Sequence, residues 1–213
     1  MRITGLIVAA GAAALALLTA APAAATPPPS PDPLTAVPGC ERGCSVVFVR
    51  ELPDDVRLAG LRTTDVATGP RRSYVAYWIG DRLHAVAEPE RQATVRDGAC
   101  GYGEGDAQRC AVSFTVGAHG SSVVSMLLTG DRGIEVTDRV RAGTPDAVIA
   151  DLNGDGRPDA VLRQGSDAPD HSAPPWYWET WSERNGTFVR TGCTAPGHGR
   201  EAAPRKPVYG HCP

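Results

Sequence analysis

Residues 73–87 read SYVAYWIGDRLHAVA, and this stretch decides the fold that the sequence predicts. Two runs rich in β-branched, aromatic and small apolar residues, 73–79 and 82–87, flank the dipeptide Gly80-Asp81. Two such runs joined by two turn-forming residues predict a β-hairpin.

The same pattern recurs along the chain. Turn residues stand between further short runs, with Gly130-Asp131-Arg132 before residue 133 and Asn185-Gly186 before residue 187. Further strands are expected at residues 45–50, 111–116, 122–129, 133–137, 147–150, 160–163, 176–182 and 187–190. No long segment combines helical periodicity with caps. We therefore predict an all-β fold of antiparallel strands with few or no helices, as a small sandwich or barrel or in a partial propeller-like arrangement.

Three of the expected hairpin turns begin at Gly80, Gly130 and Asn185, at similar intervals. Such spacing is typical of repeated units such as propeller blades, but three units are too few to close a ring of about four to eight blades. Any antiparallel protein also makes hairpins at such intervals, and this second interpretation is the one we favour from sequence.

The N-terminus has the layout of a secretory signal. Arg2 precedes an apolar run from Gly5 to about Ala21, and Ala23-Ala24-Ala25 provides a small-residue cleavage site. We predict a signal peptide over 1–25, a Pro-rich linker over 26–38 and a single disulfide-bonded domain over 39–213. A membrane anchor is the competing interpretation, but no basic stop follows the run. The mature chain is therefore expected to be secreted and extracellular, without membrane insertion.

Six cysteines lie in the mature part, which in an exported chain indicates three disulfides. Sequence alone allows about 15 pairings. The positions nonetheless suggest three local couples, which are Cys40 with Cys44, Cys100 with Cys110 across a Gly-rich loop, and Cys193 with Cys212. A zinc site is the alternative, and no C-x-x-C motif supports it.

An acidic loop carries the most specific signal. Between two short apolar strands, oxygen-bearing side chains recur at Asp151, Asn153, Asp155 and Asp159. A hard cation such as Ca²⁺ takes about six to eight oxygen ligands, and alternate side chains of a loop that wraps one ion point inward. Gly156 permits a sharp turn after which the carbonyl of Arg157 can face the ion. The alternative is an acidic turn without a ligand, since Asp, Asn and Gly are common in turns.

The loop begins like an EF-hand, but Leu162 occupies the twelfth position, where an EF-hand carries Glu. The pattern D-x-N-x-D-G-x-x-D between strands instead resembles the calcium loop of FG-GAP and VCBS repeats, and Gly186-Thr187-Phe188 resembles the G-x-F that closes such a repeat. The resemblance covers one unit, about residues 147–190. It implies calcium as cofactor, with Asp151, Asn153, Asp155, Arg157 (by its carbonyl) and Asp159 as ligands.

An aromatic segment at 176–181 holds three of the four tryptophans, Trp176, Trp178 and Trp181. On a strand, Trp176 and Trp178 share one face. Such side chains either fill a core or bind an extracellular protein or glycan. Paired carboxylates such as Glu135 and Glu179 leave a hydrolase open, although no G-x-S-x-G or H-E-x-x-H motif is present.

The full chain has 21 basic and 24 acidic residues, a balance that does not suggest nucleic-acid binding. Lys206 is the only lysine, and the abundance of Arg, Ala, Gly and Pro resembles chains from high-GC bacteria such as actinomycetes. The sequence is thus interpreted as a secreted calcium-binding β domain with a non-catalytic binding or structural role. The alternatives are a carbohydrate-active or other hydrolase with its site near 176–181, and an inhibitor of a partner enzyme.

Overall fold

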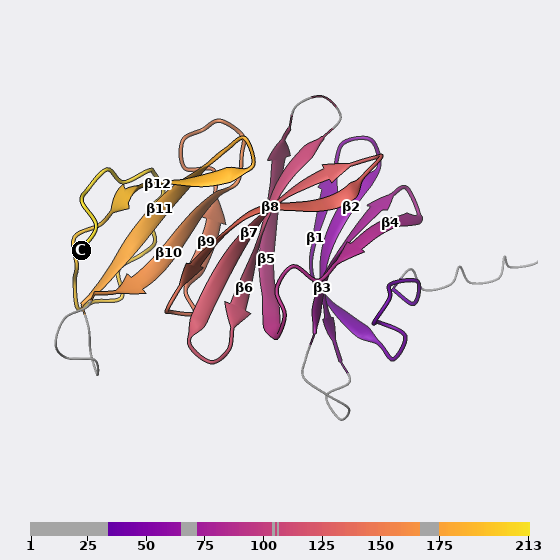
Figure 1. Ribbon diagram of the computed structural model, residues 1–213, viewed down its shortest axis with the longest axis horizontal. Helices are drawn as coiled ribbons and strands as arrows, with labels where there is room; N and C mark the ends of the chain where they lie inside the picture. Colours follow the sequence, from indigo (N-terminus) through magenta and orange to yellow (C-terminus); the bar gives the residue numbers. More distant parts are fainter. Residues whose placement is uncertain (1–33, 65–71, 104, 106, 167–174) are drawn as a thin grey trace, which may run out of the picture. The chain divides into compact units, whose positions relative to one another are not determined.

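The computed structural model describes residues 34–64, 72–103, 105, 107–166 and 175–213. These residues form twelve strands in three antiparallel sheets of four strands each, and the described residues contain no helix and no closed barrel. The all-β prediction is therefore confirmed. Figure 1 shows the sheets following one another in chain order.

We name the sheets A, B and C in that order. Sheet A consists of β1 (Cys44–Leu52), β2 (Val56–Thr63), β3 (Ser73–Ile79) and β4 (Arg82–Ala87). Sheet B consists of β5 (Ala93–Tyr102), β6 (Gln108–Val116), β7 (Gly120–Thr129) and β8 (Gly133–Ala142). Sheet C consists of β9 (Ala147–Ala150), β10 (Asp159–Gly165), β11 (Trp176–Arg184) and β12 (Thr187–Cys193).

Each sheet is a meander in which every strand pairs with the next one in the chain. The hairpins at Gly80, Gly130 and Asn185 each join the third and fourth strands of their sheet, so they occupy equivalent places. Three meanders with the same strand order thus follow one another along the described part of the chain. A four-stranded meander is also the unit of a propeller blade.

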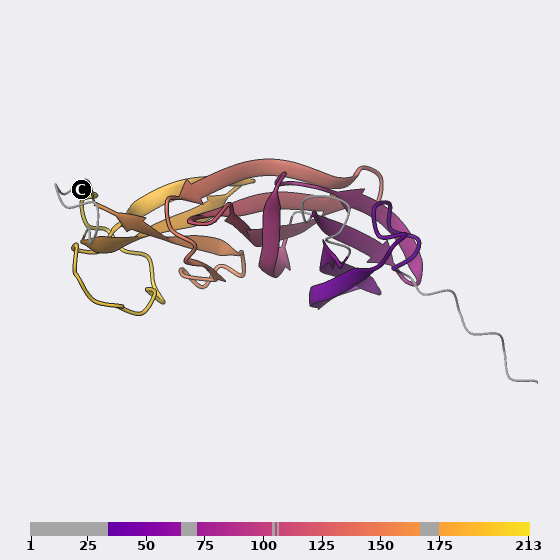
Figure 2. The same ribbon diagram turned by 90° about the horizontal axis from the view of Figure 1, so that it is seen from below.

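The sheets pack face to face and bury two apolar layers. Between sheets A and B lie, among others, Phe48, Leu58, Val112, Phe114 and Met126, all of them buried. A second layer lies between sheets B and C and contains residues such as Val123, Leu162 and Phe188. The view in Figure 2 shows the same order of sheets from another side, so sheet B is the central layer. Burial on both of its faces gives sheet B the greatest share of the hydrophobic stabilisation.

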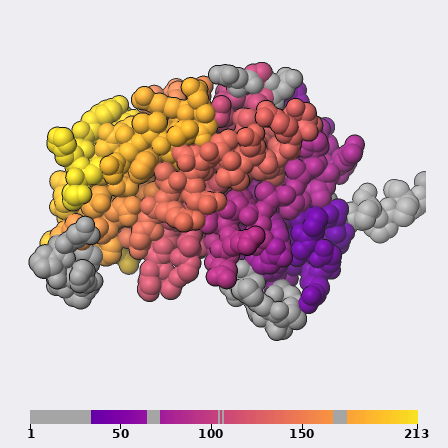
Figure 3. Space-filling model, in the orientation of Figure 1, coloured from indigo at the N-terminus to yellow at the C-terminus, as the bar shows by residue number. Residues whose placement is uncertain are grey.

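Chain ends cover the two outer faces of the stack. Val37, which is fully buried, and Leu34 pack with Leu61, Tyr74 and Trp78 on the outer face of sheet A. Leu34 and Val37, which precede the boundary expected at residue 39, thus pack with the folded part. On the outer face of sheet C, Ala203 packs against a smaller cluster of Leu152, Val161 and Trp178. Figure 3 shows the yellow C-terminal residues lying against the orange strands of sheet C.

Two strands, β2 and β5, were not predicted from the sequence. Both contain glycine, which weakens the strand signal. A Cβ added to Gly60 would lie 2.3 Å from the Phe48 ring, and one added to Gly98 would lie 2.5 Å from it. The two glycines thus make room for one aromatic side chain of β1 between sheets A and B.

The structure joins Cys40 to Cys44, Cys100 to Cys110 and Cys193 to Cys212, the local couples that the sequence suggested. Cys100 and Cys110 pair across β5 and β6. The supposed Gly-rich loop after Cys100 is therefore shorter than expected, because Gly101 and Tyr102 still belong to β5. The expected signal peptide lies outside the described residues, which include no helix long and apolar enough to span a membrane.

Candidate functional site

The acidic loop joins β9 to β10, the first hairpin of sheet C. Gly154 and Gly156 both have φ of +77°, a left-handed backbone conformation that glycine adopts at little cost. These two residues let the loop fold back on itself within a few residues, so that its side-chain oxygens face the loop's own backbone.

Asp159 fastens the loop at its end. Its side chain is fully buried, at 0% exposure. One carboxylate oxygen, Oδ2, accepts the N–H of Leu152 at 2.9 Å, which closes the loop across its base. The other, Oδ1, accepts the N–H of Glu183 in β11 at 2.8 Å. A single carboxylate thereby ties the loop to the neighbouring strand, and a buried carboxylate that accepts two N–H groups is costly to remove.

The other three side chains of the motif are exposed and bound to the backbone of the loop. Asp151 accepts the N–H groups of Gly154, Asp155 and Gly156 at 2.8, 3.1 and 3.0 Å. Asn153 Oδ1 accepts the N–H of Asp155 at 2.9 Å, and Asn153 Nδ2 donates to Asp155 Oδ2 at 3.0 Å. These bonds orient the oxygens inward before any cation is considered.

The three carboxylates of the loop repel one another. Burial raises the pKa of the Asp159 carboxyl, and the negative charges of Asp155 and Asp151 raise it further. The N–H groups of Glu183 and Leu152 favour the ionised form and act in the opposite direction. A bound cation would relieve the repulsion that these charges exert on Asp159.

A buried ion-pair network connects the loop to sheet B. Arg157 lies 3.7 Å from one carboxylate oxygen of Glu183, and Arg109 of β6 lies 3.5 Å from the other. The same carboxylate accepts the N–H of Gly186 in the β11–β12 turn. A Cβ on Gly101 of β5 would lie 1.7 Å from the carbonyl oxygen of Gly156, so only glycine permits this approach. The loop is thus part of the contact between sheets B and C.

The donor set fits a hard cation. All the expected ligands are oxygen atoms, and a carboxylate oxygen that accepts one N–H retains a lone pair for a metal. The described residues do not bring Asp151, Asp155 and Asp159 into a cluster with one ligand atom of each within 4.8 Å of the others. Among the described residues the group that does so is Glu179, Cys193 and Cys212, and its cysteines are joined in a disulfide. To hold one ion, the three carboxylates would therefore have to move closer together than they lie here.

The three tryptophans of the aromatic segment do not form one surface. Trp178 is 7% exposed and packs with Leu152 and Val161 under the C-terminal chain, where its Nε1 donates to the carbonyl of Glu201 at 3.1 Å. Trp181 packs on the other face of sheet C, between sheets B and C. Trp176 is half-buried beneath the guanidinium of Arg163.

Glu179 is buried in the same segment, and three side chains donate hydrogen bonds to it. Its carboxylate accepts Gln164 Nε2 and Trp181 Nε1, both at 3.2 Å, and Arg190 at 3.3 Å. Glu135, the other carboxylate considered, lies in β8 and pairs with Arg132 three residues before it. Glu179 is thus held by three donors, whereas Glu135 remains half-exposed on another sheet.

Sequence reasoning missed the partners that hold the loop in place. Glu183, Arg109 and Gly101 are distant from the motif along the chain, and none belongs to a recognisable pattern. One signal was available, because Gly101 follows Cys100 in a strand-like context where glycine marks a close approach of another backbone.

Comparisons of the chain with protein-family models, with curated proteins and with solved structures find no match.

Proposed function

We propose that this protein is a secreted, calcium-binding β domain with a non-catalytic binding or structural role, in which calcium orders the loop from Asp151 to Asp159. The observation that carries the proposal is the place of Asp159. This fully buried carboxylate closes the loop, binds β11 and lies within the field of two further carboxylates.

Calcium suits this loop because all of its donors are hard oxygens and calcium tolerates variable coordination geometry. The proposed ligands are the side chains of Asp151, Asn153, Asp155 and Asp159 and the carbonyl of Arg157. When bound, the ion would supply positive charge that offsets the repulsion among the carboxylates. The chain's own part is to orient the oxygens through the N–H groups of residues 154–157.

The consequence for the fold follows from what surrounds the loop. Asp159 reaches β11, Arg157 reaches Glu183, and Gly156 touches Gly101 of sheet B. Fixing the loop therefore fixes the contact between sheets B and C, so calcium would stabilise this half of the molecule by mass action. The likeness of residues 147–190 to an FG-GAP or VCBS repeat supports this role, since that range largely coincides with sheet C.

Calorimetric titration of the purified protein with calcium and, separately, with magnesium tests the proposal. We expect one calcium site with a dissociation constant on the order of 10⁻⁴ to 10⁻³ M, and weaker binding of magnesium, which demands stricter octahedral geometry. Asp155→Ala should abolish the binding. Asp54→Ala, in the β1–β2 turn, is the matched control and should leave it intact. If the wild-type protein shows neither binding heat nor a shift in melting temperature, the loop is an acidic turn that its own amides satisfy.

Secretion is a separate part of the proposal, supported by the three disulfides, which persist in oxidising compartments. Expression with residues 1–25 in a secreting host should release a protein that begins at Thr26, as N-terminal sequencing would show. Thiol titration of that protein without reductant should find no free thiol. One free thiol per chain would contradict the disulfide assignment.

A further inference from the structure

Strand β9 leaves one side of its backbone unpaired. It lies at the edge of sheet C and, among the described strands, pairs only with β10. The N–H of Arg163 donates to the carbonyl of Asp146, directly opposite, so hydrogen-bonded pairs fall at 146, 148 and 150. Residues between such pairs turn their backbone groups the other way. The N–H and C=O groups of Ala147 and Ile149 therefore point away from β10, toward the open edge.

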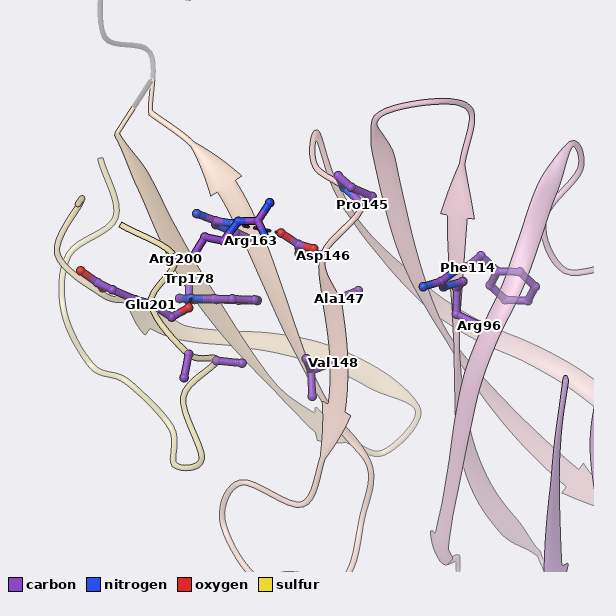
Figure 4. A pocket seen from close by; sticks show the side chains of 12 residues that line it. Arg96, Phe114, Pro145, Asp146, Ala147, Val148, Arg163, Trp178, Arg200 and Glu201 are labelled. Carbon is purple, nitrogen blue, oxygen red and sulfur yellow. Dashed lines mark hydrogen bonds and ion pairs between the residues drawn. The ribbon is translucent and has the colours of Figure 1, made fainter. Parts of the chain in front are cut away.

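Two adjoining cavities follow this edge. One, of about 550 Å³, is lined by residues that include Ala147, Val148 and Trp178, and the other, of about 500 Å³, by residues that include Val148 and Ala150. The C-terminal residues 202 and 203 line both cavities. Val148 is 39% exposed. Figure 4 shows Val148 on β9 facing this space, with Arg96 extending toward β9 from the neighbouring sheet. The open edge thus borders a groove with an apolar floor.

Arginines surround the groove. Arg96 and Arg200 line the larger cavity and Arg205 the smaller one, and all three are exposed. Within the described part of the chain none of these three makes an ion pair. The acidic Asp146 on the same rim is already paired with Arg163 at 3.1 Å, as the dashed line in Figure 4 shows. Two carboxylates that form no ion pair with the described residues, Glu201 and Asp151, also line the cavities, so the three arginines leave a small excess of positive charge at this edge.

We propose that the β9 edge is a docking site for an acidic peptide in extended conformation, which adds a fifth strand to sheet C. Backbone bonds to Ala147 and Ile149 would provide affinity, as in other cases of strand addition. Alternate apolar side chains of the peptide would lie over Val148, Ala202 and Ala203. Its acidic side chains would lie near the arginines around the groove, Arg96, Arg200 and Arg205.

The charge distribution favours this occupant over a second copy of the chain. Pairing of two β9 edges would bring both sets of unpaired arginines together, which repel one another. The shortness of β9 can also be explained without a ligand, because short edge strands protect a sheet from pairing with other chains and aggregating. That explanation does not account for the groove and its arginines.

A defined peptide tests the inference. The probe is an acetylated and amidated octapeptide that alternates Val and Glu, titrated into the intact protein and followed by calorimetry and amide hydrogen exchange. We expect binding that slows exchange at Ala147 and Ile149. Arg96→Glu and Arg200→Glu should each weaken binding by about tenfold. Arg82→Glu, at an exposed arginine on the edge strand β4, is the matched control and should change it less than twofold.

Ala147→Pro isolates the backbone contribution. Proline removes an N–H that faces the open edge and none that bonds to β10, so the variant should melt at the wild-type temperature and lose the peptide. Should this variant fail to fold, the same octapeptide N-methylated at alternate residues serves instead, because it cannot pair with β9. Equal binding of the methylated and unmethylated peptides would overturn the proposal. So would peptide-independent dimers that Ala147→Pro dissociates.

The experiment is run both in calcium and in chelator, because the proposed calcium site and the docking edge are separate claims. Of the proposed calcium ligands, only Asp151 lines the groove. Peptide binding in chelator with no calcium binding would remove the proposed function and leave the docking site. Calcium binding with no peptide binding would do the reverse.

Discussion

Sheets A and C close the two ends of the stack by different means. The outer face of sheet A carries a cluster of seven buried residues, five from its strands and two, Val37 and Cys40, from the short segment that ends at Cys44. At the outer face of sheet C the corresponding cluster has three buried residues. Sheet C relies in addition on a disulfide that spans 19 residues, a carboxylate at the base of a loop and a charged contact with sheet B. An end with little apolar burial needs specific polar and covalent ties, because hydrophobic stabilisation is proportional to the area buried.

The difference should be clearest at Asp159. Asp159→Ala leaves the N–H groups of Leu152 and Glu183 without their buried acceptor, so we expect a loss of about 4 kcal/mol in the free energy of unfolding. Denaturant titration measures it. The control is Glu88→Ala, directly after strand β4 of sheet A, which removes a pair with the half-exposed Arg72 and should cost less than about 1 kcal/mol. Equal effects of the two changes would mean that the ends are held alike.

The disulfide at sheet C should likewise contribute more to stability than the disulfide at sheet A. Replacing Cys193 and Cys212 by serine frees a long loop and should cost about 3 kcal/mol, whereas replacing Cys40 and Cys44 frees a short one and should cost about 2 kcal/mol. Melting curves of the two double variants provide the comparison. A larger loss from the Cys40–Cys44 pair would reverse our ranking of the two ends.

Calcium should stabilise the sheet C end of the molecule and leave the sheet A end unchanged. At a concentration of about 100 times the dissociation constant, binding to the folded state stabilises it by about 2.7 kcal/mol. We expect the melting temperature to rise in calcium relative to chelator for the wild-type protein and for Asp54→Ala. Asp155→Ala should show no rise, and a rise of wild-type size in that variant would place the ion elsewhere.

The smallest effect concerns alkaline pH at sheet A. Burial raises the pKa of both Tyr77 and Tyr74. At Tyr74 the positive charge of Arg72 acts in the opposite direction and lowers the pKa. A raised pKa means that the neutral phenol stabilises the fold below the unfolded value of about 10, and that this contribution is lost as pH rises through the raised pKa. Alkaline loosening should therefore begin in sheet A, seen as tyrosinate absorbance together with circular dichroism.

Tyr74→Phe sharpens this prediction. The Tyr74 hydroxyl is buried and has no hydrogen-bond partner in the described part of the chain. Its removal should change stability at pH 7 by less than about 1 kcal/mol, and in the stabilising direction. It should also move the alkaline transition to higher pH. A clear destabilisation at pH 7 would show that the hydroxyl makes a contact that sheet A needs.

Local patterns in the sequence predicted the hairpins and the acidic loop, because these depend on neighbouring residues. Gly80-Asp81 and Asn185-Gly186 stand at the turns, and strands 73–79, 82–87 and 147–150 have the expected bounds. The stacking of the sheets could not be predicted in this way. It depends on Phe48 entering the space above Gly60 and Gly98, and on Gly101 meeting Gly156, which are contacts between residues distant in sequence.

The candidate site, too, could be predicted from the sequence only in part. The spacing of Asp151, Asn153, Asp155 and Asp159 is visible in the sequence. The contacts that give the loop its structural importance are not, because Glu183 and Arg109 come from other strands and carry no motif. For the same reason the aromatic segment, conspicuous in sequence, proved to be split between two faces of sheet C.

Amide hydrogen exchange with and without calcium, read by mass spectrometry over the whole chain, tests the central claim most directly. If calcium orders the Asp151–Asp159 loop and through it the contact between sheets B and C, peptides from residues 147–165 and 176–193 should exchange more slowly in calcium than in chelator. Peptides from residues 44–63 of sheet A should exchange at the same rate in both. No slowing in sheet C, or equal slowing in sheets A and C, would contradict the account.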